Sequence, residues 1–211
     1  NILNTFLNSW EEISPDILTG WNVQGFDIPS LVNRITLLRD EKTARRLSPW
    51  KRISTRQTII HGKENQVISL VGIAVLDYLE LYKKFTYSHQ ESYRLDHIAN
   101  VETGFKKLDY EEYTNLHTLY KENYQKFIEY NIRDVELVDK IDEKMKFIDM
   151  ILALAYSAKV NYNDVFSQVR MWDTMIYHHL RKKKIVLPPK DNKSKNAQYV
   201  GAYVKDPLVG M

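Results

Sequence analysis

The sequence predicts an α/β fold, and three patterns of apolar residues support this prediction. Residues 17–19 form a short apolar stretch, and the apolar residues after it are spaced as on one face of a helix, at Ile28, Leu31, Val32 and Ile35. Residues 71–76 form a nearly unbroken apolar run, which is typical of a strand buried on both faces. Residues 120–159 carry apolar side chains three or four positions apart, which predicts a long helix.

The composition indicates a protein with a substantial core and no membrane span. Of the 211 residues, 44% are hydrophobic, the mean hydropathy is −0.44, and no apolar run approaches the ~20 residues that cross a bilayer. The absence of cysteine excludes disulfides and thiolate metal sites, and we expect a soluble, cytoplasmic protein. The net charge of +3 and the pI of about 8.8 are compatible with a nucleic-acid partner but do not require one.

The first elements follow from the spacing of large apolar side chains. Residues 2–12 are predicted to form a helix with one apolar face made of Leu3, Phe6, Leu7 and Trp10. The strand at 17–19 ends at a corner that contains Asp27. Pro29 then suits the first turn of a helix that runs to about Arg39, because a missing N–H costs little there. Residues 41–54 are polar and are expected to form a helix and then a loop.

Asp27 is the first candidate site residue. A carboxylate at a strand-to-helix corner of an α/β sheet is well placed to bind a metal ion or to act on a ligand, and the helix dipole favours its negative charge. The alternative is a simple helix cap, the commoner role of a lone Asp before a helix. The neighbours Trp21, Asn22 and Phe26 add a donor and two aromatic faces, which favours a nucleic-acid site.

A β-hairpin is predicted next. Its arms, residues 56–60 and 66–70, flank a turn at 61–65 that contains Gly and Asn. The second arm is expected to continue into the buried strand at 71–76.

Asp77 ends the apolar run and is the predicted N-cap of a helix at 78–82. Ser92 is predicted to cap the next short helix. Residues 104–118 are polar and charged, and we expect them to form a connection without regular structure.

The long helix predicted for residues 120–159 carries a second acid on its apolar stripe. The stripe consists of Phe127, Tyr130, Asp134, Val138, Ile141, Met145, Ile148 and Leu152. A carboxylate on such a face is costly to bury unless it is paired or bound to a metal ion. Two alternatives therefore stay open for Asp134: an ion pair with Arg56 or a lysine, or metal ligation. Tyr130, one turn earlier on the same face, places a phenol beside this carboxylate.

The C-terminal part differs in character. Residues 165–184 are predicted to form a helix with a basic end, residues 188–195 a linker, and residues 199–204 the beginning of a strand. The first residues start within a helical pattern without a methionine, and the last residues stop just after the strand-like stretch. We therefore expect the chain to be a piece of a longer protein.

Two segments of the chain resemble one family. Residues 19–29, TGWNVQGFDIP, resemble motif II of the 3′→5′ proofreading exonuclease in family B DNA polymerases, and residues 130–135, YNIRDV, resemble motif III. Residues 76–85, 46–49 and 199–202 are similar to polymerases of the T-even-phage type in particular, in the same order along the chain.

The resemblance implies a partial ribonuclease-H-like exonuclease fold with a β-hairpin, followed by a helical linking segment. It implies that Asp27 and Asp134 are catalytic metal ligands for two Mg²⁺ or Mn²⁺ ions, and that Tyr130 orients the attacking water. Hard divalent ions prefer such carboxylate oxygens, and two ions suffice to activate water and stabilise a leaving oxygen.

The resemblance also implies contacts with DNA. Asn22 and Phe26 would line the single-stranded 3′ end, and Lys107 would face the site. Tyr199 and Gly201 belong to a stretch, YVGA, that resembles the motif linking editing to synthesis; the family more commonly has glycine where this chain has Ala202.

One motif of the family lacks a counterpart. Motif I is an Asp-x-Glu on a strand upstream of motif II, and the triplets beginning at Asp109 and at Asp134 lie in a polar connection and in the long helix instead. The expected division is an exonuclease domain at 1–146, a helical inter-domain segment at 147–190 and the start of the polymerase palm region at 191–211.

The resulting expectation is a fragment of a DNA-directed DNA polymerase that hydrolyses mispaired 3′ ends in the complete enzyme and is inactive alone. The alternatives are a non-catalytic DNA-binding module and a helical protein-interaction domain with salt-bridged aspartates. The expected partners are DNA, the remaining polymerase domains and a sliding clamp, with no membrane, in the cytoplasm of an infected bacterial host.

Overall fold

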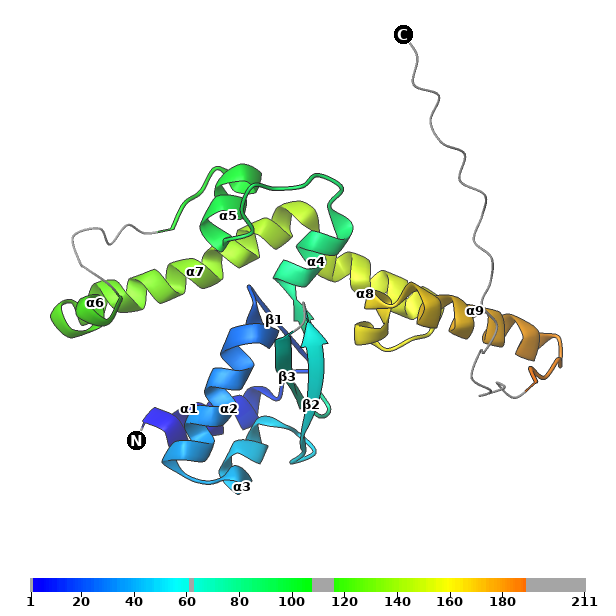
Figure 1. Cartoon of the computed structure of the whole chain (residues 1–211), viewed down its shortest axis with the longest axis horizontal. Helices are drawn as coiled ribbons and strands as arrows, with labels where there is room; N and C mark the ends of the chain where they lie inside the picture. Colours follow the sequence, from blue (N-terminus) through cyan, green and yellow to red (C-terminus); the bar gives the residue numbers. More distant parts are fainter. Residues whose placement is uncertain (1, 61–62, 108–115, 189–211) are drawn as a thin grey trace, which may run out of the picture.

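The computed structural model describes residues 2–60, 63–107 and 116–188. Helices dominate it (Figure 1): α1 (Ile2–Ile13), α2 (Ile28–Leu38), α3 (Glu41–Ala44), α4 (Tyr78–Phe85), α5 (Leu95–Thr103), α6 (Leu116–Glu122), α7 (Tyr124–Met145), α8 (Phe147–Ala158) and α9 (Gln168–Lys182). Three shorter helical pieces are the π-helical turn η1 (Val23–Asp27) and the 3₁₀ turns η2 (Arg45–Leu47) and η3 (Tyr162–Phe166). The described residues thus form a mixed α/β structure that is mostly helical.

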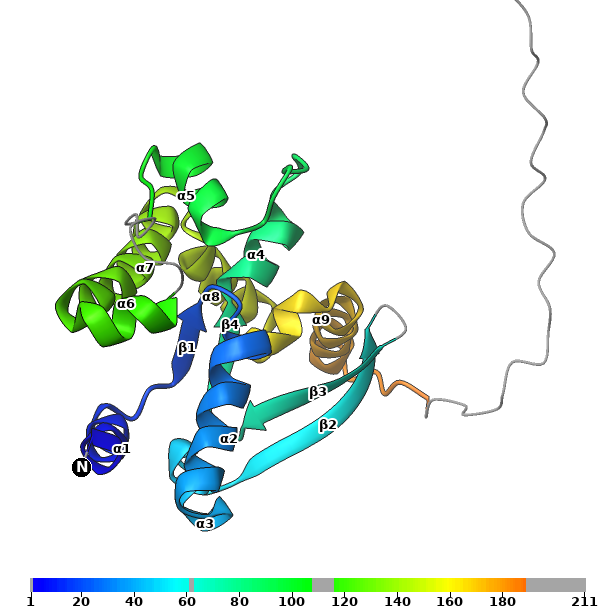
Figure 2. The ribbon, with the colours of Figure 1, turned by 60° about the vertical axis from the view of Figure 1, so that its left-hand side comes forward.

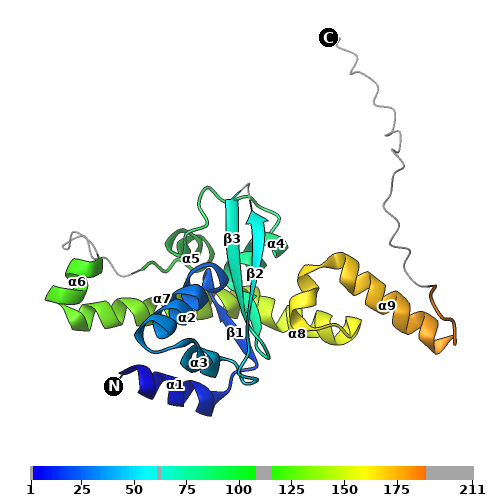
Figure 3. The same ribbon diagram turned by 60° about the horizontal axis from the view of Figure 1, so that its bottom comes forward.

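The strands form two small sheets. β1 (Ile17–Gly20) pairs in parallel with β4 (Ala74–Asp77), in the register Ile17 with Ala74 to Gly20 with Asp77 (Figure 2). β2 (Ile53–Ile60) pairs antiparallel with β3 (Lys63–Leu70), in the register Ile53 with Leu70 to Ile60 with Lys63 (Figure 3). The prediction of an α/β chain with a hairpin is confirmed in this form.

The buried carboxylate of Asp77 joins the carboxyl ends of β1 and β4. Its Oδ1 accepts hydrogen bonds from the backbone N–H of Asn22 at 2.9 Å and of Leu79 at 3.1 Å, and its Oδ2 accepts from the N–H of Gln24 at 2.9 Å. Asp77 therefore caps α4, as predicted, and also holds η1, which follows β1. Burial raises the pKa of Asp77 above its ordinary value, although the three N–H groups oppose that shift.

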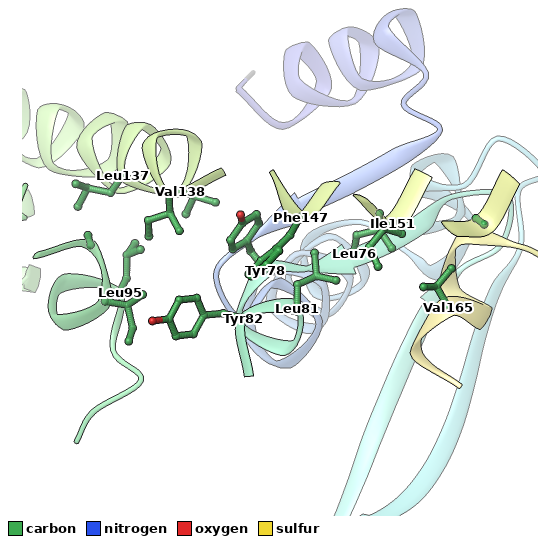
Figure 4. Close-up of a cluster of buried hydrophobic side chains, with 14 residues drawn as sticks. Leu76, Tyr78, Leu81, Tyr82, Leu95, Leu137, Val138, Phe147, Ile151 and Val165 are labelled. Atoms are coloured by element: carbon green, nitrogen blue, oxygen red, sulfur yellow. The ribbon is translucent and has the colours of Figure 1, made fainter. Parts of the chain in front are cut away.

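Two clusters of buried side chains form the core. The larger one packs α4, α5, α7 and α8 against the end of β4, and Figure 4 shows it: Leu76, Tyr78, Leu81, Tyr82, Leu95, Leu137, Val138, Phe147, Ile151 and Val165. The smaller one lies between α1, η1, α2 and the start of the hairpin, and includes Leu7, Val32, Ile35, Leu47 and Leu70. The apolar stripes predicted for α1 and α2 supply part of the second cluster.

The single long helix predicted for residues 120–159 is wrong, because the chain forms α6, α7 and α8 in its place. The first break lies at Asn123, whose side chain accepts a hydrogen bond from the Lys126 N–H at 3.0 Å and so begins α7. The second lies at Lys146, which adopts φ 55°. There the Asp142 carboxylate accepts from the Tyr78 hydroxyl at 2.9 Å and from the Ile148 N–H at 3.2 Å. These two partly buried hydrogen bonds hold the chain at the break.

The predicted strand at 71–76 is also interrupted. β3 ends at Leu70, and a turn at Val71 and Gly72 precedes β4. Gly72 has φ +97°, which favours glycine, and the Ser48 hydroxyl donates to the Val71 carbonyl at 2.6 Å.

Other predicted boundaries change by several residues. The hairpin strands extend further than predicted, so residues 63–65 belong to β3 rather than to the turn, and residues 61–62 lie outside the described part. Ser92 accepts from the Arg94 N–H, but Arg94 is the N-cap of α5. Residues 116–118 begin α6 instead of continuing a loop, and the helix predicted from residue 165 starts at Gln168, after η3.

Some predictions fall outside the described residues. These are the triplet beginning at Asp109, the linker beyond residue 188, the strand at 199–204, and the candidate residues Tyr199 and Gly201. Among the helices that are described, none is long and apolar enough to cross a membrane.

Replacing Asp77 by alanine should strongly destabilise the fold. Asp77→Ala leaves three backbone N–H groups without their acceptor, and we expect a loss of about 3 kcal/mol in the free energy of unfolding, measured by urea denaturation. The matched control is Asp40→Ala, which removes one exposed N-cap bond to Thr43 and should cost about 1 kcal/mol. Equal losses in the two variants would contradict the role assigned to Asp77.

Acid should weaken the contact between α1 and the segment after α3. Hydrogen bonds and ion pairs with Arg46 and Lys51 lower the pKa of Glu11 from 4.5 to about 2. A lowered pKa in the folded state gives stability above pH 4.5 that disappears as the pH falls toward 2. Glu11→Gln should therefore destabilise the chain at pH 6, and this destabilisation should become much smaller as the pH falls toward 2. Glu12→Gln, at an exposed neighbouring position, should show no such difference; a pH-independent effect of Glu11→Gln would refute the assignment.

Candidate functional site

The candidate site lies on α7, where Lys107 contacts the side chains of Tyr130 and Asp134. The Lys107 Nζ is 2.8 Å from the Asp134 Oδ2 and 3.2 Å from the Tyr130 hydroxyl oxygen. The same ammonium lies 5.3 Å from the centre of the Tyr130 ring, which is a cation–π distance. The Lys107 backbone N–H donates to the Asp96 Oδ1 at 2.9 Å, so α5 helps to hold the lysine in place.

Asp134 forms an ion pair, which is one of the two alternatives left open by the sequence, and keeps one oxygen without a partner in the described part of the chain. A lysine pairs with its Oδ2, and that lysine is Lys107 rather than Arg56. Its Oδ1 is buried and has no hydrogen-bond partner among the described residues. A buried polar atom without a partner is uncommon and points to a missing water, ion or ligand.

Electrostatics keep Lys107 charged. Burial by itself would lower the pKa of Lys107, but the hydrogen bond and charge of Asp134, with a further bond to Tyr130, raise this pKa above its ordinary value. The ammonium therefore remains protonated at neutral pH and offsets part of the negative charge of Asp134.

Asp27 lies at the end of η1, where the chain enters α2. Its backbone is already helical, with φ −68° and ψ −48°, and its side chain makes no capping hydrogen bond. The simple cap predicted as the alternative is therefore wrong. The carboxylate is exposed, and partial desolvation followed by the nearby charge of Asp77 raises the pKa of Asp27.

Of the aromatic and polar neighbours of Asp27, Asn22 and Phe26 are exposed and Trp21 packs toward the core. Asn22 adopts φ 64°, and a Cβ at Gly25 would lie 2.5 Å from the Asn22 Oδ1, so glycine makes room for this side chain. The Phe26 ring is 65% exposed, which leaves it available to a ligand. Trp21 does not join them: its indole N–H donates to the Tyr93 carbonyl at 3.1 Å, and its ring packs toward the core.

The two candidate aspartates come from different elements near one end of the parallel sheet. α7 passes the carboxyl end of β1 in Figures 1, 2 and 3, and η1 with Asp27 follows that end directly. The described residues contain no group of three or more His, Asp or Glu side chains placed to hold a metal ion. The structure brings Lys107, Tyr130 and Asp134 together, and the convergence of Asp27 with Asp134 stays a prediction.

The sequence identified Asp77 only as a helix cap. It gave no sign of the hydrogen bonds that Asp77 accepts from the backbone of Asn22 and Gln24. The acceptor and its donors are 53 and 55 residues apart, and no local pattern reveals such a contact. Lys107 was found through the family resemblance alone, because it lies in a polar segment 27 residues before Asp134.

The partly buried ion pair between Lys107 and Asp134 should be measurable by a double-mutant cycle. From the unfolding free energies of Lys107→Met, Asp134→Asn and the double variant we expect a coupling of about 1 kcal/mol, because water screens this pair less than an exposed one. The comparison pair, Lys83 with Glu80, is more exposed and 3.6 Å apart, and its cycle should give under about 0.5 kcal/mol. A coupling no larger than that of the exposed pair would show that Lys107 and Asp134 do not form a stabilising ion pair.

Comparisons with known proteins identify the family to which the chain is similar. Residues 1–98 match the family described as DNA polymerase family B, exonuclease domain. The chain is 42% identical over 210 residues to a DNA-directed DNA polymerase of Escherichia phage RB69, and 37% identical over 209 residues to that of Enterobacteria phage T4. Each alignment covers 98% of this chain and 23% of the relative.

More distant relatives show the same relationship. A DNA polymerase delta catalytic subunit of Mesocricetus auratus is 24% identical over 223 residues, covering all of this chain and 20% of the relative. The chain thus spans less than a quarter of the length of these relatives. The chain therefore belongs to the family B DNA polymerases of the T4 type, and its residues 1–98 match the exonuclease domain of that family.

Proposed function

We propose that this chain is the proofreading part of a DNA polymerase, which in the complete enzyme hydrolyses mispaired 3′ ends of DNA. The observation that carries the proposal is the unpartnered buried Oδ1 of Asp134, with the Tyr130 hydroxyl and the Lys107 ammonium around the same carboxylate. The relatives are named DNA-directed DNA polymerases and are more than four times as long, so the activity is proposed for the longer polypeptide.

The donor set fits a hard divalent cation. The Oδ1 of Asp134 and the exposed carboxylate of Asp27 offer oxygen ligands, which Mg²⁺ and Mn²⁺ prefer. In this proposal both aspartates hold metal, and two bound ions would supply an activated water and stabilise the leaving oxygen. Two carboxylates are few for two ions, so further acids are needed from the rest of the polypeptide.

The other residues of the site have roles that follow from their positions. The Tyr130 hydroxyl is held by Lys107 and would orient the attacking water. Asn22 and the exposed ring of Phe26, on either side of Gly25, would accept the single-stranded 3′ end. Tyr199 and Gly201 remain proposed DNA contacts by resemblance.

The finer fold assignment is part of the same proposal. We infer a ribonuclease-H-like exonuclease fold for residues 1–146, a helical inter-domain segment at 147–190 and the start of the palm at 191–211. Lys146, where α7 ends and α8 begins, lies at the first of these boundaries, although α8 shares the larger core cluster with α7. The proposed partners are DNA, the remaining polymerase domains and a sliding clamp, and the proposed location is the cytoplasm of the phage host.

A non-catalytic DNA-binding module is the second candidate function. The ion pair of Asp134 with Lys107 favours it, because an aspartate already neutralised by a lysine attracts a metal ion less strongly. A measurement of DNA hydrolysis distinguishes the two functions, because only the exonuclease hydrolyses DNA.

The test compares this chain with a version extended upstream through an Asp-x-Glu strand. Both are incubated with labelled single-stranded DNA and Mg²⁺ or Mn²⁺, and released nucleotides are measured. We expect the extended chain to hydrolyse DNA and the present chain to be slower by about a thousandfold, since it supplies too few metal ligands.

Asp134→Ala in the extended chain should abolish hydrolysis. Asp139→Ala, at an exposed position on the same helix, should leave hydrolysis unchanged. Equal rates for the short and extended chains would overturn the ligand-count argument, and an inactive extended chain that still binds DNA would support the non-catalytic module.

A further inference from the structure

Three aromatic rings gather where α6 meets the beginning of α7. The ring centre of Tyr120 lies 5.5 Å from that of Tyr124 and 5.4 Å from that of Phe127, with interplanar angles of 75° and 78°. Tyr124 and Phe127 are stacked, with centres 6.5 Å apart and planes 23° from parallel. We call Tyr120, Tyr124 and Phe127 the aromatic cluster. It is not used by the proposed chemistry.

The aromatic cluster is a surface feature. Tyr120 is 49% exposed and Tyr124 is 53% exposed, and neither belongs to the two core clusters. Leu119 of α6 is fully buried, and α6 packs against α7. In Figures 1 and 3, α6 and the start of α7 lie at one end of the molecule. Large rings held by mutual packing but open to water form a preorganised contact surface.

The aromatic cluster lies in line with the candidate site. Phe127, Tyr130 and Asp134 follow each other at steps of three and four residues, so they share one face of α7. At 1.5 Å per residue, Phe127 lies about 10 Å from Asp134 along the helix axis and Tyr124 about 15 Å. These spans correspond to roughly three to five nucleotides of a stacked strand, at about 3.4 Å each.

We propose that the aromatic cluster is a stacking platform for unpaired bases of a DNA strand whose 3′ end occupies the candidate site. This inference rests on the proposed function. Flat aromatic faces stack on any base, and phenol tips keep contact with water at the edge of such a stack.

The surroundings favour a nucleic-acid strand over a protein partner. The other exposed side chains on this part of α6 and α7 are mostly polar, namely His117, Lys121, Glu122 and Gln125, and only Leu116 adds aliphatic surface. A protein-binding patch normally has an apolar core depleted of charge. Lys121, the residue after Tyr120, is exposed and offers a positive charge for a phosphate on this part of α6, next to the negative charge of Glu122.

The experiment measures binding of a 5′-labelled oligothymidylate to this chain by fluorescence anisotropy, in EDTA so that no hydrolysis occurs. Tyr120→Leu/Tyr124→Leu should weaken binding by about tenfold or more, which is the effect expected for losing one or two stacked bases. Tyr120→Phe/Tyr124→Phe keeps the rings and should bind within about twofold of the original chain. Tyr156→Leu, on α8, removes an even more exposed tyrosine outside the aromatic cluster and should have no effect.

A second oligonucleotide, with abasic residues replacing its internal bases, shows whether stacking causes the difference. The leucine variant and the original chain should bind this strand equally. An equal loss on both strands would overturn the platform, because it would indicate a general structural effect. Unchanged binding of thymidylate by the leucine variant would overturn it too and would favour a protein contact, with the proposed function left standing. A failure of the original chain to bind any strand would overturn both.

Discussion

The arrangement of the candidate site depends on a single buried carboxylate, that of Asp77. It accepts hydrogen bonds from the N–H groups of Asn22, Gln24 and Leu79, and so joins the turn after β1 to the first turn of α4. Asp27 and Phe26 belong to that turn, and Tyr78 of α4 is part of the larger core cluster. The position of the proposed DNA-binding turn relative to the core is therefore set by these charge-assisted hydrogen bonds together with the packing of Val23 of η1 in the smaller core cluster.

The acids of this region carry different chemistry because their environments differ. Asp77 is buried and fully engaged with backbone donors, which makes it structural. Asp134 shares one oxygen with Lys107 and keeps the other unpartnered. Asp27 is exposed and its pKa is raised, first by desolvation and then by Asp77. Of these three acids, Asp27 and Asp134 have oxygens available to a cation.

Local patterns predicted the elements well and their interruptions poorly. The apolar stripes of α1 and α2 and the hairpin follow from residue spacing alone. The break at Lys146 has no local signal, because lysine favours helix, and it arises from the contact of Asp142 with the distant Tyr78. The apolar run at 71–76 predicted one continuous strand, but Gly72, with φ +97°, lies in a turn that interrupts it. In the candidate site, Asp27, Tyr130 and Asp134 stood out by position, whereas the partner of Asp134 depended on tertiary contact.

The way α7 is fastened has a mechanical consequence. Its 22 residues span about 33 Å, and three of its four buried residues, Leu137, Val138 and Ile141, lie in its C-terminal half. The C-terminal end is clamped further through Asp142. Bending of α7 would therefore displace the aromatic cluster at its N-terminal end more than Asp134, which lies near the middle of the helix. A helix anchored in this way tolerates variation in the path of a bound DNA strand and keeps the Asp134 carboxylate at a constant position relative to the core.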